Sequence, residues 1–124
     1  MSLWNVDIEL IELIELIEVW LAELDVDSRE QVVAAIELLE DSGRQLGRPI
    51  VDTVKASRHK NIKELRPGSS GKSELRILFA FDPERAAIML IAGDKAGDWQ
   101  GWYEKNLPHA DRLFDEHLDK IRGK

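Results

Sequence analysis

Cysteine is absent from this chain of 124 residues, which excludes disulfide bonds, thiolate catalysis and cysteine-based zinc sites. The absence also suits a reducing compartment, and we expect a cytoplasmic protein. No apolar run approaches the roughly 18 residues that a membrane-spanning helix needs. No basic stretch leads into an apolar segment with a small-residue cleavage site, so we expect no signal peptide.

The sequence also has little that points to a metal or to a familiar hydrolase motif. Its histidines, His59, His109 and His117, lack metal-ligand spacing, and neither G-x-S-x-G nor HExxH occurs. Residues 71–73, Gly-Lys-Ser, look like the end of a phosphate-binding P-loop, but that motif needs a glycine where Arg66 stands and a helix afterwards. A strand-like pattern follows instead, so we expect neither a metal nor a nucleotide cofactor.

Charge is distributed unevenly along the chain, whose formal net charge is −7. Residues 1–54 carry 13 acidic and 3 basic residues, whereas residues 55–76 carry 2 acidic and 7 basic residues. An acidic protein with one concentrated basic segment attracts nucleic acid weakly at long range, so that segment must act locally. The alternative is a solvated, lysine-rich edge strand that resists aggregation.

Hydrophobic periodicity predicts an α+β fold in a single domain over residues 1–124. Residues 4–10 alternate like a strand, Ser28 resembles the start of a capping box, Gly43 a C-terminal cap, and Pro108 the first turn of a helix. We expect a loop at 94–105. The predicted elements are a strand at 1–11, a helical hairpin at 12–42, a small antiparallel sheet at 61–93 and a C-terminal helix at 107–121.

Several cations fall at or beside the ends of the predicted strands, with Arg66 and Arg76 on the two arms of one hairpin and Lys95 after the last strand. Arginine forks match phosphate geometry, so together these residues favour a phosphate-binding surface. The alternative is that each arginine pairs with a surface carboxylate. The lack of acidic residues between Glu74 and Asp82 argues against such pairing.

Three aromatic residues, Trp99, Trp102 and Tyr103, lie close together in the predicted loop. Aromatic side chains in a loop can stack on bases or can close the end of a core. The phenol of Tyr103 becomes a possible acid or base if nearby cations lower its pKa.

The segments RHKNIKELR, LRILFAFDPERAAIMLIAGDK, WY and ADRLFDEHL, in this order, resemble the RelE/ParE superfamily of toxins from type II toxin–antitoxin systems. They are most similar to its HigB-like, phage Gp49-like branch. The resemblance is strong over about residues 48–119 and weaker in the helical hairpin. It implies a RelE-like microbial RNase fold, with an antiparallel sheet flanked by a helical hairpin and a terminal helix.

The resemblance implies an endoribonuclease that cleaves mRNA on the ribosome without a metal, by attack of a 2′-hydroxyl on the adjacent phosphate. It implies a cognate antitoxin, commonly of the helix-turn-helix type. The family's functional positions fall on Arg66, Arg76, Lys95 and Tyr103. The candidates for RNA contacts are Lys55, Arg58, His59, Lys60, Lys63, Lys72 and Trp102.

The sequence departs from the family where two lysines are expected on the first hairpin arm. Ile62 and Glu64 occupy those positions, and Lys63 lies one residue out of register. Either Tyr103 or Lys63 is then the candidate base. Two other functions stay open: a ParE-like toxin that binds gyrase, and a catalytically decayed protein that binds only its antitoxin.

Overall fold

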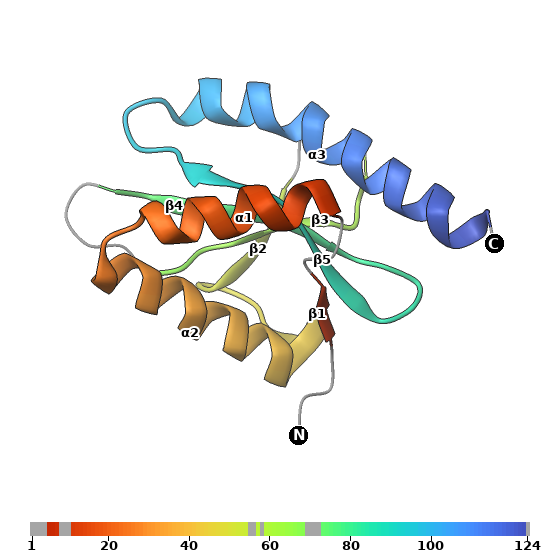
Figure 1. The fold of residues 1–124 in the computed structure, drawn as a ribbon, viewed down its shortest axis with the longest axis horizontal. Coiled ribbons are helices and arrows are strands. Elements are labelled where there is room, and N and C mark those ends of the chain that lie inside the picture. The colour runs from red at the N-terminus through yellow and green to blue at the C-terminus, as the bar shows by residue number, and fades with distance from the viewer. Residues whose placement is uncertain (1–4, 8–10, 55–56, 58, 69–72, 124) are drawn as a thin grey trace.

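The computed structural model describes residues 5–7, 11–54, 57, 59–68 and 73–123, with side-chain positions from Ile17 onward. It is an α+β fold, as the sequence predicts, with a five-stranded sheet between helices (Figure 1). The strand order is β1-β5-β4-β3-β2; β1 pairs with β5 in parallel and the other neighbours are antiparallel. In chain order the elements are β1 (Asn5–Asp7), α1 (Ile11–Glu23), α2 (Val26–Ser42), a 3₁₀ turn (Gly43–Gln45), β2 (Val51–Thr53), β3 (Ile62–Leu65), β4 (Leu75–Phe81), β5 (Ala86–Asp94) and α3 (Trp99–Arg122).

The predicted helical hairpin is present as α1 and α2, but its second helix begins earlier than predicted. Asp25, not Ser28, is the N-cap of α2, and its carboxylate accepts a hydrogen bond from the backbone N–H of Ser28 at 3.1 Å. An aspartate at this position satisfies a backbone donor that the first helical turn leaves free. Gly43 is the C-cap, as predicted, and its φ of 55° is a conformation that favours glycine.

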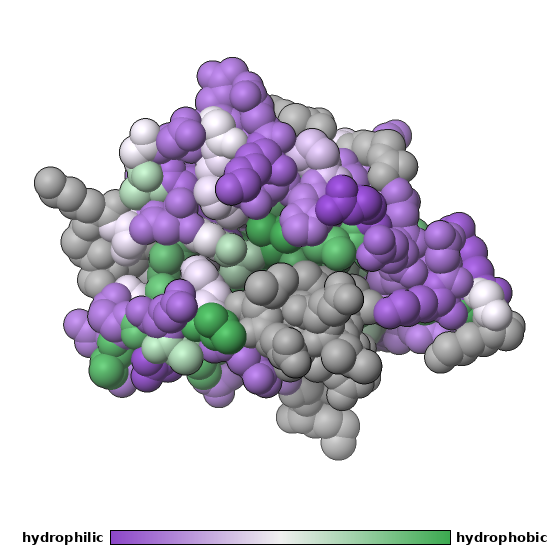
Figure 2. Space-filling view, turned by 45° about the horizontal axis from the view of Figure 1, so that its top comes forward, coloured by the Kyte–Doolittle hydropathy of each residue, from purple (hydrophilic) through white to green (hydrophobic). Residues whose placement is uncertain are grey.

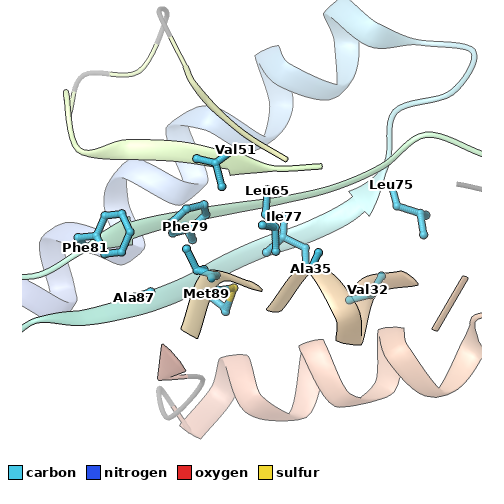
Figure 3. Close-up of a cluster of buried hydrophobic side chains, with 11 residues drawn as sticks. Val32, Ala35, Val51, Leu65, Leu75, Ile77, Phe79, Phe81, Ala87 and Met89 are labelled. Atoms are coloured by element: carbon cyan, nitrogen blue, oxygen red, sulfur yellow. The ribbon is translucent and has the colours of Figure 1, made fainter. Parts of the chain in front are cut away.

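Alternation along β4 divides the core into two layers, one on each face of the sheet. Leu75, Ile77, Phe79 and Phe81 face the hairpin, where they pack against residues of α2, including Val32, Ala35 and Leu39 (Figure 3). Leu78 and Ala80 face α3 and pack with Phe114 of that helix. Both faces of the sheet are therefore covered, the first by the hairpin and the second by α3.

Three strands of the predicted sheet are confirmed, and one strand is missing from the prediction. β3, β4 and β5 agree with the predicted strands to within about one residue at each end, while β2 falls where the sequence shows no clear alternation. β3 and β4 are antiparallel neighbours, as the predicted β-hairpin with Arg66 and Arg76 on its arms requires. Residues 69–72 of its predicted turn lie outside the described residues.

The predicted start of the last helix is wrong. α3 begins at Trp99, so most of the predicted loop at 94–105 is helical, and Pro108 lies well inside the helix. Asp98 caps the helix and accepts a hydrogen bond from the N–H of Gly101 at 3.1 Å. The early start places Trp99, Trp102 and Tyr103 on a helix above the sheet.

Among the residues that the structure describes, no helix combines the length and the apolar character needed to cross a membrane.

Candidate functional site

The strands β3 and β4 and the first turns of α3 meet at one place in the molecule. Glu64 lies on β3 opposite Leu78 of β4, so its side chain points to the face of the sheet that α3 covers. Arg76 lies on the same face of β4, since it is two residues from Leu78. Arg66 follows β3 directly, and Tyr103 comes from α3. The structure thus brings together residues that are up to 39 positions apart in the chain.

Glu64 is the centre of this cluster, and it is only 2% exposed. The hydroxyl of Tyr103 donates a hydrogen bond to Oε1 of Glu64. The guanidinium of Arg66 contacts the other carboxylate oxygen, with Nε at 3.1 Å and Nη2 at 3.0 Å. Nε of Arg76 lies 3.5 Å from Oε1. A buried carboxylate with two arginines and a phenol around it is a densely charged polar site.

Two further carboxylates, those of Asp52 and Glu74, pair with the same cations. Arg66 contacts Asp52 at 3.1 Å, whereas Glu74 lies 4.0 Å from Arg76 and 3.9 Å from Lys95. The sequence argument against such pairing was wrong, because the acidic partners come from β2, from β3 and from Glu74, just before β4. Each arginine is therefore paired with a carboxylate, which is the alternative to a phosphate-binding surface.

Asp52 also pairs with Arg48 at 3.1 Å, at the outer edge of the site. The hydrogen bond from Arg48 is the main cause of a lowered pKa at Asp52, and it raises the pKa of Arg48 in return. Asp52 therefore keeps its negative charge beside Arg66 down to a lower pH than a free aspartate would.

The pKa of Tyr103 is raised, first by burial and then by the hydrogen bond to the negatively charged Glu64. Arg76 acts in the opposite direction but does not outweigh these causes. The condition for a tyrosine base, a pKa lowered by neighbouring cations, is therefore not met. Tyr103 keeps its proton and acts as a hydrogen-bond donor in this site.

Lys95 lies beneath the aromatic residues and is 3% exposed. Its Nζ is 3.7 Å from the centroid of the Trp99 ring and 3.4 Å from the hydroxyl of Tyr103. Burial, and then the charge of Arg76, lower the pKa of Lys95. An ammonium so enclosed supports the Trp99 ring and the Tyr103 phenol.

Trp102, a candidate for stacking on a base, is half-buried and packs against β5 and the core instead of offering a free ring. An added Cβ on Gly93 of β5 would lie 2.7 Å from its Nε1, so the indole rests directly on the strand backbone. Its ring also meets that of Tyr103 edge-on. Trp99 is the exposed aromatic residue of this turn, with 57% of its surface accessible, and its Nε1 donates to Glu74 at 3.3 Å.

The remaining candidates for RNA contact are not gathered at this cluster. His59 binds Asp115 at 2.7 Å near the other end of α3, roughly 18 Å along the helix from Tyr103. Lys63 pairs with Phe79 and so lies on the opposite face of the sheet from Glu64, as its register predicts. Lys60 is exposed in a turn. Lys55, Arg58 and Lys72 lie outside the described residues.

Sequence reasoning missed two parts of the site. The sequence marks Glu64 only as a departure from the family. Its place among basic residues on a predicted strand was the signal that could have assigned it to the site. Asp52 gave no signal, because β2 is too short to show a pattern. The described part of the chain holds no group of three or more histidine, aspartate or glutamate residues arranged to bind a metal ion.

A pocket of about 580 Å³ opens beside the cluster, between β2, β3 and α3. Glu64, Arg66 and Tyr103 form part of its wall. The other lining residues are Thr53, Val54, Gln100, Glu104, Leu107 and Pro108. The charged cluster therefore borders a space large enough for a small organic group.

A family profile described as "Phage derived protein Gp49-like" matches residues 19–115, which include every residue of the cluster. The chain belongs to this family. The resemblance predicted from the sequence is thereby confirmed for the Gp49-like branch.

Two curated relatives of this Gp49-like chain come from Mycobacterium tuberculosis. The chain is 57% identical over 115 residues to "Putative toxin HigB2", an alignment that covers 93% of this chain and 54% of the relative. It is 48% identical over 107 residues to "Putative toxin HigB3", covering 86% of this chain and 91% of that relative. The chain thus spans about half the length of HigB2 and most of HigB3. No solved structure matches it.

Proposed function

We propose that the chain is the toxin of a type II toxin–antitoxin system and that it cleaves mRNA on the ribosome without a metal. The names of the two relatives support the toxin assignment. The observation that carries the cleavage proposal is the convergence of Glu64, Tyr103, Arg66 and Arg76 beside an open pocket. The partners we propose are mRNA, the ribosome and a helix-turn-helix antitoxin, all in the cytoplasm.

Glu64 is the group best placed to accept a proton in this site. In the proposed reaction the 2′-hydroxyl loses its proton to the Glu64 carboxylate as its oxygen bonds to the adjacent phosphorus. The P–O5′ bond breaks and leaves a 2′,3′-cyclic phosphate. This role replaces the two bases suggested by the sequence, because Lys63 is on the other face of the sheet and Tyr103 keeps its proton.

Tyr103 is suited to the opposite role, donation of a proton to the leaving 5′-oxygen. An alkoxide is a stronger base than a phenolate, so the transfer is favourable even from a phenol with a raised pKa. The ammonium of Lys95, 3.4 Å from the hydroxyl, stabilises the phenolate as it forms. The proton gained by Glu64 then returns to Tyr103 through their hydrogen bond, which resets both groups.

The arginines supply the positive charge that the pentavalent phosphate requires. Within the described residues, Nε of Arg76 is a buried donor that lies 3.5 Å from the Glu64 carboxylate but makes no hydrogen bond. Leaving such a donor unsatisfied costs about 1–3 kcal/mol, and a phosphate oxygen would satisfy it. Arg66 can turn from Asp52 toward the same phosphate, since its side chain is one-third exposed.

The resting ion pairs also favour a second candidate, a catalytically decayed protein that binds only its antitoxin. Every cation of the cluster, Arg66, Arg76 and Lys95, already contacts a carboxylate. In that case the cluster is a structural network and removing one member affects stability alone. A ParE-like gyrase toxin is the remaining alternative and would leave RNA intact.

The test is primer extension on a defined mRNA in a reconstituted translation reaction, with and without ribosomes and EDTA. The wild type is compared with Glu64→Gln, Arg76→Ala and Tyr103→Phe, all checked for folding by circular dichroism. Ribosome-dependent cuts that persist in EDTA, end in a cyclic phosphate and vanish in the variants support the proposal. An inactive, folded wild type contradicts it, and a gyrase supercoiling assay then separates the two alternatives.

A further inference from the structure

The pocket beside Glu64 has the composition of a site for a flat, partly apolar ring. Val54, Leu107 and Pro108 form apolar walls, and Leu107 is only 5% exposed. Its volume of about 580 Å³ lies within the range of small-molecule sites. Because Tyr103 and Arg66 border both the pocket and the charged cluster, a ring in the pocket would be joined to a phosphate at the cluster.

Two exposed polar side chains of α3 border this pocket and are joined by a hydrogen bond. Nε2 of Gln100 donates a hydrogen bond to Oε1 of Glu104 at 2.9 Å, one helical turn away. A carboxylate accepts several hydrogen bonds, and a side-chain amide carries two N–H donors. Gln100 and Glu104 therefore present a donor next to a pair of acceptors at the edge of an apolar pocket.

This pattern complements one of the four RNA bases. Guanine presents the O6 acceptor and then the N1–H and N2–H₂ donors along its pairing edge, whereas adenine, cytosine and uracil lack two adjacent donors there. A carboxylate can accept from both guanine donors, while the amide donates to O6. We propose that the pocket binds a guanine base next to the cleaved phosphate and that Glu104 and Gln100 determine this specificity. The proposal rests on the function proposed above.

The experiment measures binding of guanosine, adenosine, cytidine and uridine 3′-monophosphates to the full chain by isothermal titration calorimetry. Inorganic phosphate provides the reference for the phosphate alone. We expect the wild type to bind the guanosine nucleotide about tenfold or more tightly than the others, as a bidentate contact to a base edge allows. Glu104→Gln removes a carboxylate acceptor and should abolish the preference.

Glu116→Gln is the matched control, because it makes the same charge change on an exposed residue of α3 outside the lining of the pocket. It should retain the preference, and Gln100→Ala should weaken it. Equal affinity for all four nucleotides, or a guanine preference that survives in Glu104→Gln, overturns the inference. Binding no tighter than that of inorganic phosphate also overturns it.

Cleavage mapping separates this inference from the function on which it rests. Cuts by the wild type without guanine at a fixed position would overturn the pocket assignment and leave the nuclease standing. Guanine binding that depends on Glu104, in a protein that cuts no RNA, would support the pocket and contradict the nuclease.

Discussion

Glu64 stands where the family pattern leads one to expect a lysine, and its surroundings indicate what it does there. It is buried, accepts a hydrogen bond from the hydroxyl of Tyr103 and lies between two arginines. A buried carboxylate persists only when its charge is compensated, and here the compensating groups are those that a phosphate needs. Under the proposed mechanism, the residue that first suggested loss of activity is therefore the best-placed base.

Replacing Glu64 with glutamine tests this role directly. Glutamine keeps the shape and can still accept the Tyr103 hydrogen bond, but it cannot take a proton. We expect cleavage to fall by roughly 10²–10⁴-fold, the usual contribution of a general base. The measurement is the single-turnover rate on ribosome-bound mRNA, with Glu116→Gln as control. A rate within about threefold of wild type in a folded variant would contradict the assignment.

The raised pKa of Tyr103 can be observed without any substrate, because it is the one tyrosine in the chain. Titration by near-ultraviolet absorbance should show no tyrosinate at the ordinary pKa of 10.0 while the protein is folded. In Glu64→Gln the pKa should fall, since the negative charge is gone. Ionisation of the folded wild type at its ordinary pKa would contradict the buried hydrogen bond.

The same shift has a consequence for stability at high pH. The folded pKa lies above the unfolded value, so the contribution of Tyr103 is complete below about pH 10 and is lost as pH rises through the folded pKa. Urea unfolding should therefore show wild-type stability falling above about pH 10. In Tyr103→Phe the free energy of unfolding should fall less steeply above this pH. An equally steep fall in that variant would contradict the contribution assigned to Tyr103.

The first turns of α3 position both the phenol and the exposed indole, and they depend on close contact with β5. Gly93 allows this contact, since Trp102 rests where a Cβ would stand. The helix begins at Trp99 because Asp98 caps it. This early start allows the hydroxyl of Tyr103 to reach Glu64. Local sequence thus controls the site through the position of one helix end.

Gly93→Ala should displace Trp102 and with it the beginning of α3. An added methyl at 2.7 Å from Nε1 forces a shift, and overpacking of this kind costs about 1–3 kcal/mol. The control is Gly47→Ala, where nothing lies within 4 Å of the added atom. We expect a lower urea midpoint and slower cleavage for Gly93→Ala alone. Equal midpoints for the two variants would show that α3 does not rely on this contact.

The acidic helical hairpin covers one face of the sheet, and the cluster around Glu64, in which cations and carboxylates are paired, lies on the other face. On the face seen in Figure 2 the surface over α3 is mostly hydrophilic, and hydrophobic residues gather toward the hairpin. The exposed large hydrophobic residues of the hairpin are Val19, Val26, Val33 and Leu38. If the chain binds RNA as proposed, the acidic helical hairpin would repel it, and RNA would approach from the side of α3 and of the strand ends beside Glu64.

Binding of RNA should therefore depend only weakly on salt. If Arg66 and Arg76 are the main phosphate contacts, the slope of log affinity against log salt should be about −1 to −2. Fluorescence anisotropy with a 2′-O-methylated RNA, which cannot be cleaved, gives this slope. A slope steeper than about −4 would instead assign RNA contacts to the basic segment that includes Lys55, Arg58, Lys60, Lys63 and Lys72.

The periodicity of the chain was enough to predict much of the fold. Alternation in β4 correctly placed Leu75, Ile77, Phe79 and Phe81 on one face, because a strand with two covered faces still sorts its side chains by pleat. The start of α3 was missed because tryptophan, glycine and proline weaken the helical pattern there, while Asp98 and packing on Gly93 override these propensities.

The sequence by itself determined the α+β class, the order of the main elements, the family, and the arginines and tyrosine of the candidate site. The class and the order of the elements follow from hydrophobic periodicity, a local property of the chain, whereas the family and its functional positions follow from the resemblance. Only the packing of β2, β3, β4 and α3 decided that Glu64 is the centre of the site, that Tyr103 keeps its proton and that Asp52 and Glu74 pair with the cations. Charges interact through space, so their partners and pKa values follow from distances between strands that no spacing along the chain contains.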